Sequence, residues 1–358
     1  MRRFLVALVA LGVALMVGIR SEAVDSSRAA ASSVTPITWV DEPVSFPVGG
    51  LTVYATFRHP LHDPFSTPGV LLIAGSGPTN RNGNTTEAPG PVNTIENLAD
   101  WLSQDGVASL RYDKLGSGQT GLGPFASQPS AIGVAPYQQE TAAAFRFLAR
   151  QKGIDDQRLG VFAHSEGALY ALLLASGHDG HVPPIHALGL FEPLSIRYLD
   201  LLEVQVQAQL TSEVAAGSLT SQAAAAQEAA LAGAVQQFRA TDQLPPNLPY
   251  GISNYFAGPS LKYLDQADRF VPETLAASIP KGTPVLITCS NVDAQVTCPE
   301  VDQVHQGLVR SHSLIDFVHL SGVNHGLRVD PTGTNYSTSL RFSPVLRTAI
   351  KQFVRSSL

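Results

Sequence analysis

Charged residues are scarce in this chain, and positive charge is in the minority. Lys, Arg, Asp and Glu make up 15% of the 358 residues, apolar residues make up 44%, and the formal net charge is -6 at pH 7. A chain with this balance can build a large core, which excludes broad disorder. Since no positive excess is available to neutralise phosphates, we expect no nucleic-acid partner. No internal repeat is visible, so we expect one large domain with an insertion, or two domains.

The N-terminal segment has the pattern of a secretory signal. Arg2 and Arg3 precede an uncharged apolar run over residues 4–19, and small residues follow near Ala23. We therefore predict a signal peptide over residues 1–23, a Ser/Ala-rich linker over 24–36, and a secreted or cell-envelope location. An uncleaved leader that acts as an N-terminal membrane anchor, or keeps the protein at the membrane periphery, is the alternative.

Cysteine is nearly absent, since Cys289 and Cys298 are the only two. In an exported chain so few thiols favour a disulfide bridge, and two inert buried thiols are the alternative. Closing so short a loop would stabilise the fold by about 2.5 kcal/mol on the chain-entropy model. His178, His181 and His186 lie in a Gly/Pro-rich loop without helical spacing. We therefore expect no metal and no cofactor.

Short apolar runs alternate with helical patterns along most of the chain. Two runs over residues 37–48 and 51–58 flank Gly49-Gly50, which predicts an antiparallel hairpin. The later runs, typical of buried parallel strands, are 70–74, 108–112, 159–163, 186–191, 285–288 and 315–320. The helical patterns are 94–104, 137–151, 167–176, 299–310 and 344–353. This alternation predicts an α/β fold with a mostly parallel, doubly wound sheet, whose ligand site lies outside the carboxyl ends of the strands.

The alternation breaks between residues 195 and 280. This segment holds an Ala/Gln-rich helical block over 201–240 and then a Pro-rich stretch. We therefore predict a core made of residues 37–194 and 281–358, interrupted by a helical insertion over 195–280. Above the carboxyl edge of the sheet the insertion would form a lid whose apolar faces line a substrate pocket. An insertion that only covers exposed sheet is the alternative.

Ser165 stands between an apolar run and an Ala/Leu-rich helical pattern. A strand that turns sharply into a helix forces its serine into strained backbone angles, and the small residues Ala163 and Gly167 let the chain pass close to itself. The hydroxyl would then lie at the carboxyl end of the sheet, beside the positive end of a helix. We predict that Ser165 is a nucleophile; a serine that only caps the helix is the alternative.

A serine hydroxyl needs a histidine to take its proton and a carboxylate to orient that histidine. Asp293 and His325 follow the last two predicted strands, so both fall in loops at the edge where Ser165 lies. Glu192, at the end of an earlier strand, is the alternative acid. If the disulfide forms, it brackets Asp293 and holds that loop in place.

The remaining histidines are less well placed. We expect His164 to point elsewhere on the tight turn beside Ser165. His319 lies inside a predicted strand, and His305 and His312 flank a helix. His325 therefore remains as the base.

Acyl transfer also needs hydrogen-bond donors for the developing oxyanion, each worth about 3 kcal/mol. One candidate is the backbone N–H of Glu166, directly after the nucleophile. The other should come from the loop after the first parallel strand, where Ser76 is preferred and Gly77 is next. A plain Gly-Pro turn is the alternative for that loop.

A second glycine-rich segment invites a different interpretation. Residues 116–121 fit G-x-G-x-x-G after a strand, but Leu122-Gly123-Pro124 follows where a dinucleotide fold needs a helix. We therefore expect these glycines to turn the chain beside the rim of the site rather than to bind a nucleotide.

Three segments in order resemble a known group. Residues 75–84 (GSGPTNRNGN), 111–118 (RYDKLGSG) and 163–167 (AHSEG) look like the bacterial α/β-hydrolases of the esterase or serine aminopeptidase-like group. The resemblance covers about residues 37–194 and resumes near 284. It implies the α/β-hydrolase fold with the chain order Ser, Asp, His.

By that resemblance Ser165, Asp293 and His325 match the nucleophile, acid and base positions. The chain departs from the commoner forms of the group at Asn80, where aspartate is expected, and at Leu115, where arginine is expected. Ala163 is a third departure. These changes remove charge near the predicted mouth, which weakens any expectation of a charged peptide terminus as substrate.

Together these features predict a secreted serine hydrolase that cleaves a small-molecule carboxylic ester with a modest apolar acyl group. A peptidase, a thioesterase or an acyltransferase could use the same three side chains, because pocket shape and acceptor decide among them. An exported envelope binding protein that kept the fold without the chemistry is the alternative from another class. The sequence predicts no oligomeric state.

Overall fold

The computed structural model describes residues 37–62, 66–85, 90–178, 180–248, 252, 253, 256 and 261–358. The predicted signal peptide (1–23) and linker (24–36) lie outside these residues. Within the part that is described, no helix combines the length and the apolar character needed to cross a bilayer.

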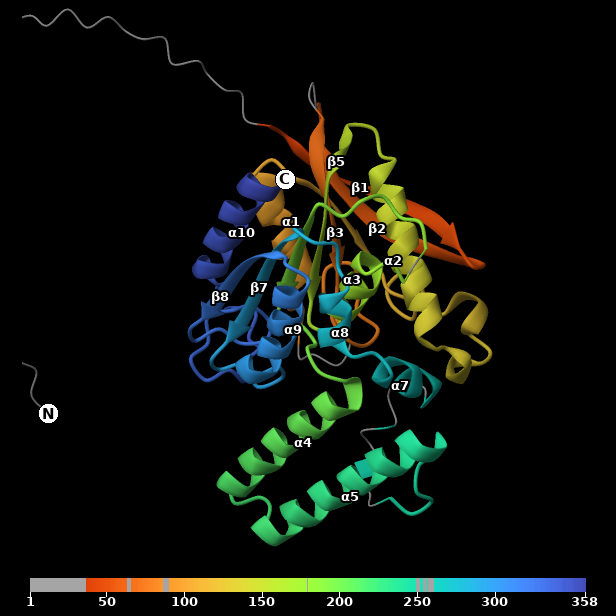
Figure 1. The fold of residues 1–358 in the computed structure, drawn as a ribbon, viewed down its shortest axis with the longest axis vertical. Helices are drawn as coiled ribbons and strands as arrows, with labels where there is room; N and C mark the ends of the chain where they lie inside the picture. The colour runs from red at the N-terminus through yellow and green to blue at the C-terminus, as the bar shows by residue number, and fades with distance from the viewer. Residues whose placement is uncertain are drawn as a thin grey trace, which may run out of the picture. The chain divides into compact units, whose positions relative to one another are not determined.

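One sheet forms the centre of the described chain, with the strand order β1-β2-β4-β3-β5-β6-β7-β8 (Figure 1). The strands are β1 (Trp39–Val48), β2 (Leu51–Pro60), β3 (Thr67–Ile73), β4 (Ala108–Tyr112), β5 (Ile154–His164), β6 (Ala187–Phe191), β7 (Pro284–Ser290) and β8 (Leu314–Leu320). β2 pairs antiparallel with β1 and β4, and the other neighbouring strands pair in parallel. The prediction of a mostly parallel, doubly wound sheet is confirmed.

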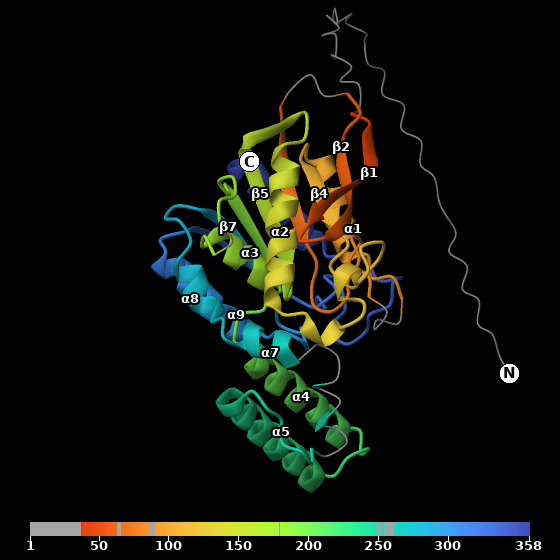
Figure 2. The same cartoon turned by 90° about the vertical axis from the view of Figure 1, so that its right-hand side faces the viewer.

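Helices cover both faces of this sheet (Figures 1 and 2). The helices of the core are α1 (Thr94–Gln104), α2 (Val134–Ala149), α3 (Gly167–Ala175), α8 (Pro272–Ala277), α9 (Cys298–Arg310) and α10 (Pro344–Ser357). α1 and α10 pack on one face, where Leu72 and Phe162 are buried. α2, α3, α8 and α9 pack on the other, where Leu71 and Val161 are buried. The side chains of consecutive strand residues thus pack into opposite layers, because side chains alternate between the two faces of a sheet.

The first hairpin joins β1 to β2 through Gly49 and Gly50. Val48 pairs with Leu51, so the loop has two residues, and both glycines have positive φ values of 55° and 80°. Such a turn matches the twist of the flanking strands and favours glycine at both positions. The predicted hairpin is therefore present.

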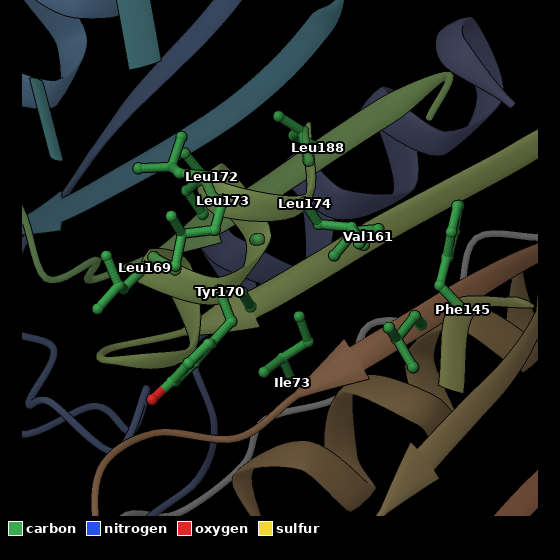
Figure 3. Packing of buried hydrophobic residues seen from close by; sticks show 14 of the residues in the cluster. Ile73, Phe145, Val161, Leu169, Tyr170, Leu172, Leu173, Leu174 and Leu188 are labelled. Atoms are coloured by element: carbon green, nitrogen blue, oxygen red, sulfur yellow. The ribbon is translucent and has the colours of Figure 1, made fainter. Parts of the chain in front are cut away.

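α3 is apolar on all sides and lies inside the molecule. Its residues from Gly167 to Leu174 are all buried, and Figure 3 shows Tyr170 beside Ile73 of β3, with Leu169 and Leu172 projecting from other sides of the helix. A helix without a polar face is stable in water only when neighbouring elements cover it. This burial fixes the helix that begins directly after Ser165.

The helical insertion lies between β6 and β7 and has an apolar cluster of its own. Its helices are α4 (Tyr198–Ala215), α5 (Ser221–Thr241) and α7 (Leu261–Asp268). The buried residues of the cluster are Leu199, Val206, Leu210, Ala224, Leu231, Ala234, Val235, Phe238, Ile252, Phe256 and Leu264. α8, which also falls within 195–280, instead contributes Leu275 and Ala276 to the core.

The helical block predicted over 201–240 is divided into two helices. α4 ends before Gly217, whose φ is 73°, and α5 begins after Thr220, whose side chain accepts a hydrogen bond from the amide of Ala223. A glycine with positive φ and a threonine cap are the usual signals for a helix end and a helix start. The alanine-rich sequence on both sides favours a continuous helix, so these two signals did not lead to a predicted break.

Candidate active site

Ser165 occupies a sharp turn between β5 and α3. Its φ is 55°, a left-handed conformation that a non-glycine residue rarely adopts. The turn is possible only because its neighbours are small: a Cβ atom at Gly167 would lie 2.7 Å from the carbonyl oxygens of Ile73 and Ala74. Such strain commonly marks functional positions. The geometry is that of the predicted nucleophile elbow.

His325 lies in the loop after β8 and contacts both Ser165 and Asp293. Its Nε2 atom is 2.9 Å from the Oγ atom of Ser165, and its Nδ1 atom is 2.7 Å from Oδ2 of Asp293. Asp293 follows β7, as predicted, and its side chain is fully buried, whereas the His325 side chain is 14% exposed. Three residues that are distant in the chain therefore form one hydrogen-bonded series.

Asp293 is held in its ionised form, which is the form that can accept a hydrogen bond from His325. Burial opposes its ionisation, but the charge and hydrogen bond of His325 outweigh it and hold the pKa of Asp293 below its usual value. Oδ1 also accepts hydrogen bonds from the amides of Gln295 at 2.7 Å and Val296 at 3.2 Å. The carboxylate is therefore charged near neutral pH and fixed in orientation.

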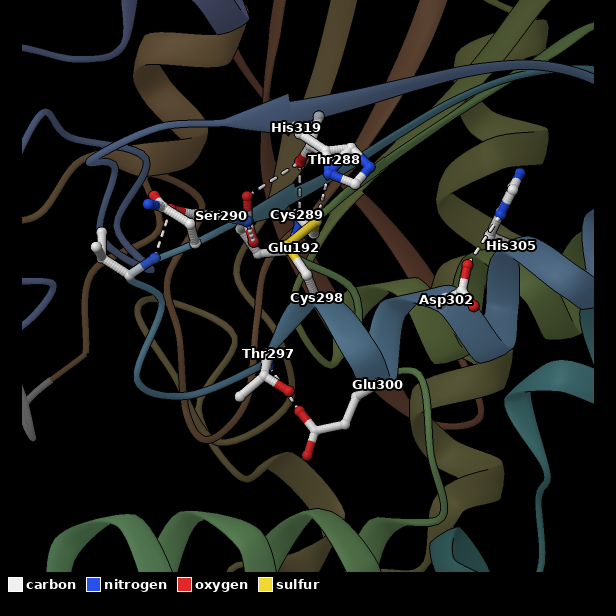
Figure 4. The surroundings of a disulfide bond; sticks show 12 residues. Glu192, Thr288, Cys289, Ser290, Thr297, Cys298, Glu300, Asp302, His305 and His319 are labelled. Atoms are coloured by element: carbon white, nitrogen blue, oxygen red, sulfur yellow. Dashed lines mark hydrogen bonds and ion pairs between the residues drawn. A yellow bond between two sulfur atoms is a disulfide. The ribbon is translucent and has the colours of Figure 1, made fainter.

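Glu192, the alternative acid, is buried behind Asp293. Its carboxyl group accepts hydrogen bonds from the amide of Ser290 at 3.0 Å and from the Thr288 hydroxyl at 3.2 Å (Figure 4). Burial, and then the charge of Asp293, raise the pKa of Glu192 well above its usual value. The structure thus pairs His325 with Asp293, and Glu192 lies beside that pair with a raised pKa.

His164 is oriented differently from the sequence expectation. Instead of pointing away from the site, its ring lies 4.8 Å from the ring of His325, centroid to centroid. Nε2 of His164 is 2.7 Å from the carbonyl oxygen of His325 and must carry the proton, since a carbonyl only accepts. The only sequence signal for this contact is that His164 directly precedes Ser165, and that position alone does not predict where the ring points.

The predicted bridge between Cys289 and Cys298 is present and links the end of β7 to the start of α9 (Figure 4). It closes a loop that contains Asp293. His319 lies nearby, with Nδ1 3.8 Å from the Cys289 sulfur. The bridge and a capping box between Thr297 and the first turn of α9 fix both ends of the loop.

The two preferred oxyanion donors belong to residues that share a pocket with Ser165. Ser76 and Glu166 border the same pocket as Ser165. Within the described chain, neither of their amides donates to a protein acceptor. The loop of Ser76 is fixed by the Thr79 hydroxyl, which donates to the Ser76 carbonyl at 2.7 Å. Gly77, the second choice, is exposed and has a φ of 73°.

The glycine-rich segment of residues 116–121 wraps around Asp113. A Cβ atom at Gly118 would lie 2.3 Å from the Asp113 carboxyl group, and the amide of Gln119 donates to that group at 2.9 Å. Arg81 adds an ion pair with Asp113 at 2.6 Å. The short turn Gly123–Phe125 (η1) follows, not an α-helix. These glycines thus brace the loop that carries Ser76.

Two positions at which the chain differs from the commoner forms of the esterase-like group, Asn80 and Leu115, have structural roles. The Asn80 side chain accepts hydrogen bonds from the amides of Asn82 and Asn84, so it closes a local turn. Leu115 is only 1% exposed and belongs to the core. Leu115 is therefore not at the mouth of the site, where the sequence analysis expected it.

A pocket of about 130 Å³ opens in front of Ser165. The core contributes Ser76, Ser165 and Glu166 to its wall, and the insertion side contributes Leu194, Tyr198, Leu201, Leu202, Gln205 and Leu264. The Tyr198 hydroxyl donates to Glu166 at 3.1 Å, and the Gln205 amide donates to the Gln295 carbonyl at 2.9 Å. The insertion is thus hydrogen-bonded to both sides of the site.

Solved structures of hydrolases share this fold. Est1E from Butyrivibrio proteoclasticus with ferulic acid bound is 17% identical and covers 88% of this chain and 98% of its own, with a TM-score of 0.55. The Pyrococcus furiosus esterase Pf2001 is 15% identical over 89% of this chain and 91% of its own, with a TM-score of 0.53. A dienelactone hydrolase-like promiscuous phosphotriesterase from metagenomic libraries is 15% identical over 89% and 98%, with a TM-score of 0.50.

No protein-family model matches the chain, and no curated protein matches it in sequence. At such low identity the likeness to solved structures shows the fold alone. The described chain has the α/β-hydrolase fold, as expected from its three sequence segments.

Proposed function

We propose that this protein is a serine hydrolase that cleaves carboxylic esters through an acyl-enzyme on Ser165. The observation that carries the proposal is the series from Ser165 through His325 to Asp293, with contacts of 2.9 and 2.7 Å, at the wall of a pocket. Esterases among the structures with the same fold are in keeping with it.

The first half of the reaction forms the acyl-enzyme. His325 Nε2 takes the hydroxyl proton as Ser165 Oγ bonds to the acyl carbon, and Asp293 stabilises the imidazolium. The carbonyl oxygen becomes an oxyanion, which accepts hydrogen bonds from the amides of Ser76 and Glu166. When the carbon–oxygen bond to the alcohol breaks, Nε2 returns the proton to the departing alcohol.

The second half repeats the chemistry with water. His325 takes a proton from a water molecule whose oxygen attacks the acyl carbon, and the same amides hold the new oxyanion. Collapse releases the carboxylic acid and returns the proton to Ser165 Oγ. Both halves need the same alignment of base and nucleophile, so one rigid site serves both.

The pocket favours a modest, uncharged acyl group. Leucines form most of its insertion wall, and its volume of about 130 Å³ admits only a short chain. Glu166, the acidic group in the wall, is already engaged by Lys114 at 3.2 Å and by Tyr198 at 3.1 Å. A peptide amine would find no free counter-charge there, which favours an ester over an aminopeptidase substrate.

We extend the proposal to the compartment: the protein is secreted or held at the cell envelope. The leader pattern of residues 1–23 supports export. The bridge between Cys289 and Cys298 supports an oxidising compartment, since such bonds are rarely kept in the cytosol.

Labelling and a substrate comparison test the proposal. Purified protein should react with a fluorophosphonate at Ser165 and hydrolyse p-nitrophenyl acetate or butyrate faster than aminoacyl p-nitroanilides. Ser165→Ala should abolish labelling and lower kcat by at least about 10³-fold. Hydrolysis of the anilides alone would favour a peptidase. An unlabelled protein without esterase activity would favour an exported binding protein that has only the fold.

A further inference from the structure

Lys114 is a buried cation that the proposed reaction does not use. It follows β4, and its side chain is 2% exposed. Nζ donates to the Gly75 carbonyl oxygen at 2.7 Å and to Oε1 of Glu166 at 3.2 Å. The rings of Tyr137 and Tyr170 lie 5.6 and 5.9 Å from it. Burying an ammonium group is costly, so a lysine in this position calls for an explanation.

The Gly75 carbonyl belongs to the same peptide unit as the Ser76 amide. A cation that binds the C=O end of a peptide draws electron density toward that oxygen and leaves the N–H end a stronger donor. The Gly75 backbone also lies directly beside the nucleophile, since a Cβ atom there would be 3.1 Å from Cβ of Ser165. Lys114 therefore contacts a peptide group that lies beside Ser165.

The second contact of Lys114 reaches the other oxyanion donor. The Glu166 side chain is held from both sides, by Lys114 and by the Tyr198 hydroxyl of α4. Glu166 lines the same pocket as Ser165, and anchoring its side chain also restrains its backbone there. One ammonium group thus links both candidate donors.

We propose, on the basis of the proposed function, that Lys114 is a positioning residue of the oxyanion site. It polarises and holds the Gly75–Ser76 peptide and, through Glu166, fixes the second donor. The effect is felt where negative charge develops on the substrate oxygen, so it lowers the barrier without strengthening ground-state binding.

Glu140 does not replace Glu166 as the counter-charge. Its carboxyl group is fully buried and accepts a hydrogen bond from the Leu115 amide at 2.9 Å. Burial raises the pKa of Glu140 to about 8 in spite of the opposing effect of Lys114. Near neutral pH Glu140 is therefore mostly protonated, and the acidic side chain in direct contact with Lys114 is that of Glu166.

The decisive variant is the double substitution Lys114→Met with Glu166→Gln, which removes both buried charges and leaves no uncompensated ion. We expect kcat for p-nitrophenyl butyrate to fall roughly tenfold, because one donor is weakened rather than lost, with KM within about twofold. Glu166→Gln alone keeps an acceptor for Lys114 and its contact with Gly75, so it should lose less. Lys351→Met, at an exposed position of α10, is the matched control and should change neither parameter.

A trifluoromethyl ketone separates positioning from general damage, because it forms a tetrahedral oxyanion on Ser165. In the double variant its inhibition constant should rise by the same factor by which kcat/KM falls, while inhibition by a neutral alcohol such as 1-butanol, which forms no oxyanion, stays unchanged. Unaltered kcat, or a fall in kcat without a matching loss of ketone affinity, would refute the role of Lys114. If the wild-type protein does not react with fluorophosphonate, the proposed function itself fails.

The single variants keep the inference testable if the double variant does not fold, as judged by circular dichroism. Lys114→Arg keeps a cation that can reach the Gly75 carbonyl and should retain more kcat than Lys114→Met. Equal activity of these two variants would contradict polarisation by a cation.

Discussion

Nε2 of His164 donates a hydrogen bond to the carbonyl oxygen of His325 over 2.7 Å, so the residue before the nucleophile holds the backbone of the base. Burial, and then the nearby His325, lower the pKa of His164 to about 3. The His164 ring is therefore neutral at physiological pH.

His164→Ala should lower kcat several-fold, because the loop of His325 loses a hydrogen bond worth about 1 kcal/mol. His164→Gln, whose amide can donate from nearly the same place, should restore much of the activity. Steady-state kinetics on a p-nitrophenyl ester measures both. Equal activity of the two variants would show that the donor is unimportant.

The same residue predicts a pH dependence of stability. Between pH 6.5 and about 3 the unfolded chain binds a proton on His164 that the folded chain does not. Stability from this group is therefore complete above pH 6.5 and falls by up to about 1.4 kcal/mol per unit as the pH drops. Buried Glu140, with its raised pKa, acts in the opposite sense. The informative quantity is thus the difference in unfolding free energy between wild type and His164→Gln, which should shrink toward pH 4.

Replacing the carboxyl group by an amide should have very different effects on kcat at Asp293 and at Glu192. Asp293→Asn should lower kcat by about 10³- to 10⁴-fold, because the amide no longer stabilises the imidazolium or its tautomer. Glu192→Gln should lower kcat less than tenfold, since Glu192 contacts Thr288 and Ser290 and the partner of His325 is Asp293. Comparable losses in the two variants would mean that His325 changes partner during the reaction.

Removing the bridge should weaken both the fold and the site. Cys289→Ser with Cys298→Ser should lower the unfolding free energy by about 2.5 kcal/mol and reduce kcat, because the loop that carries Asp293 loses its tie. Urea unfolding and ester hydrolysis measure the two effects. Mild reductant should reproduce them in the wild type and leave the serine variant unchanged; a reductant effect on both would point to another cause.

Asp268 should control the stability of the insertion. It accepts hydrogen bonds from Arg197, Arg239 and the Leu199 amide, which joins the ends of α4, α5 and α7. Asp268→Ala removes the carboxylate that pairs with Arg197 and one of the two that pair with Arg239, which keeps Asp200, and should destabilise the insertion by about 1 to 2 kcal/mol. Limited proteolysis should then cut within residues 198–268 while the sheet stays protected. Uniform loss of protection would instead place Asp268 in the global folding unit.

Acyl preference should follow the insertion wall of the pocket. Leu201→Ala enlarges the pocket and should raise kcat/KM for hexanoate relative to butyrate by about tenfold, because each methylene contributes about 1 to 3 kcal/mol. Leu231→Ala removes the same atoms from the cluster inside the insertion and should leave the ratio unchanged. Identical ratios in both variants would place the acyl group elsewhere.

Much of the fold could be predicted because buried parallel strands are short, continuous apolar runs. The limits of β6 and β8 lie within one residue of the predicted ones. The antiparallel strands β1 and β2 flank the glycine turn that predicted them. The polar start of β5, from Ile154 to Arg158, was missed because its side chains are partly exposed and lack apolar periodicity. Of that segment only Ile154 pairs in the sheet, with Thr67, and residues 155–158 form an irregularity before pairing resumes at Leu159.

The candidate site was predicted to the extent that topology alone brings residues together. Loops after parallel strands meet at one edge, which was enough to place Ser165, Asp293 and His325. The contact of Lys114 with the Gly75 carbonyl could not be foreseen, since it depends on a side chain crossing between two loops.

The nucleophile precedes its base by 160 residues, and the base follows β8, which pairs only with β7 at the edge of the sheet. During synthesis the Ser165 hydroxyl therefore emerges long before the His325 imidazole that activates it in the proposed mechanism. On that mechanism a nascent or truncated chain that lacks the last strand carries an unactivated alcohol, and reactivity arises only when the final segment docks.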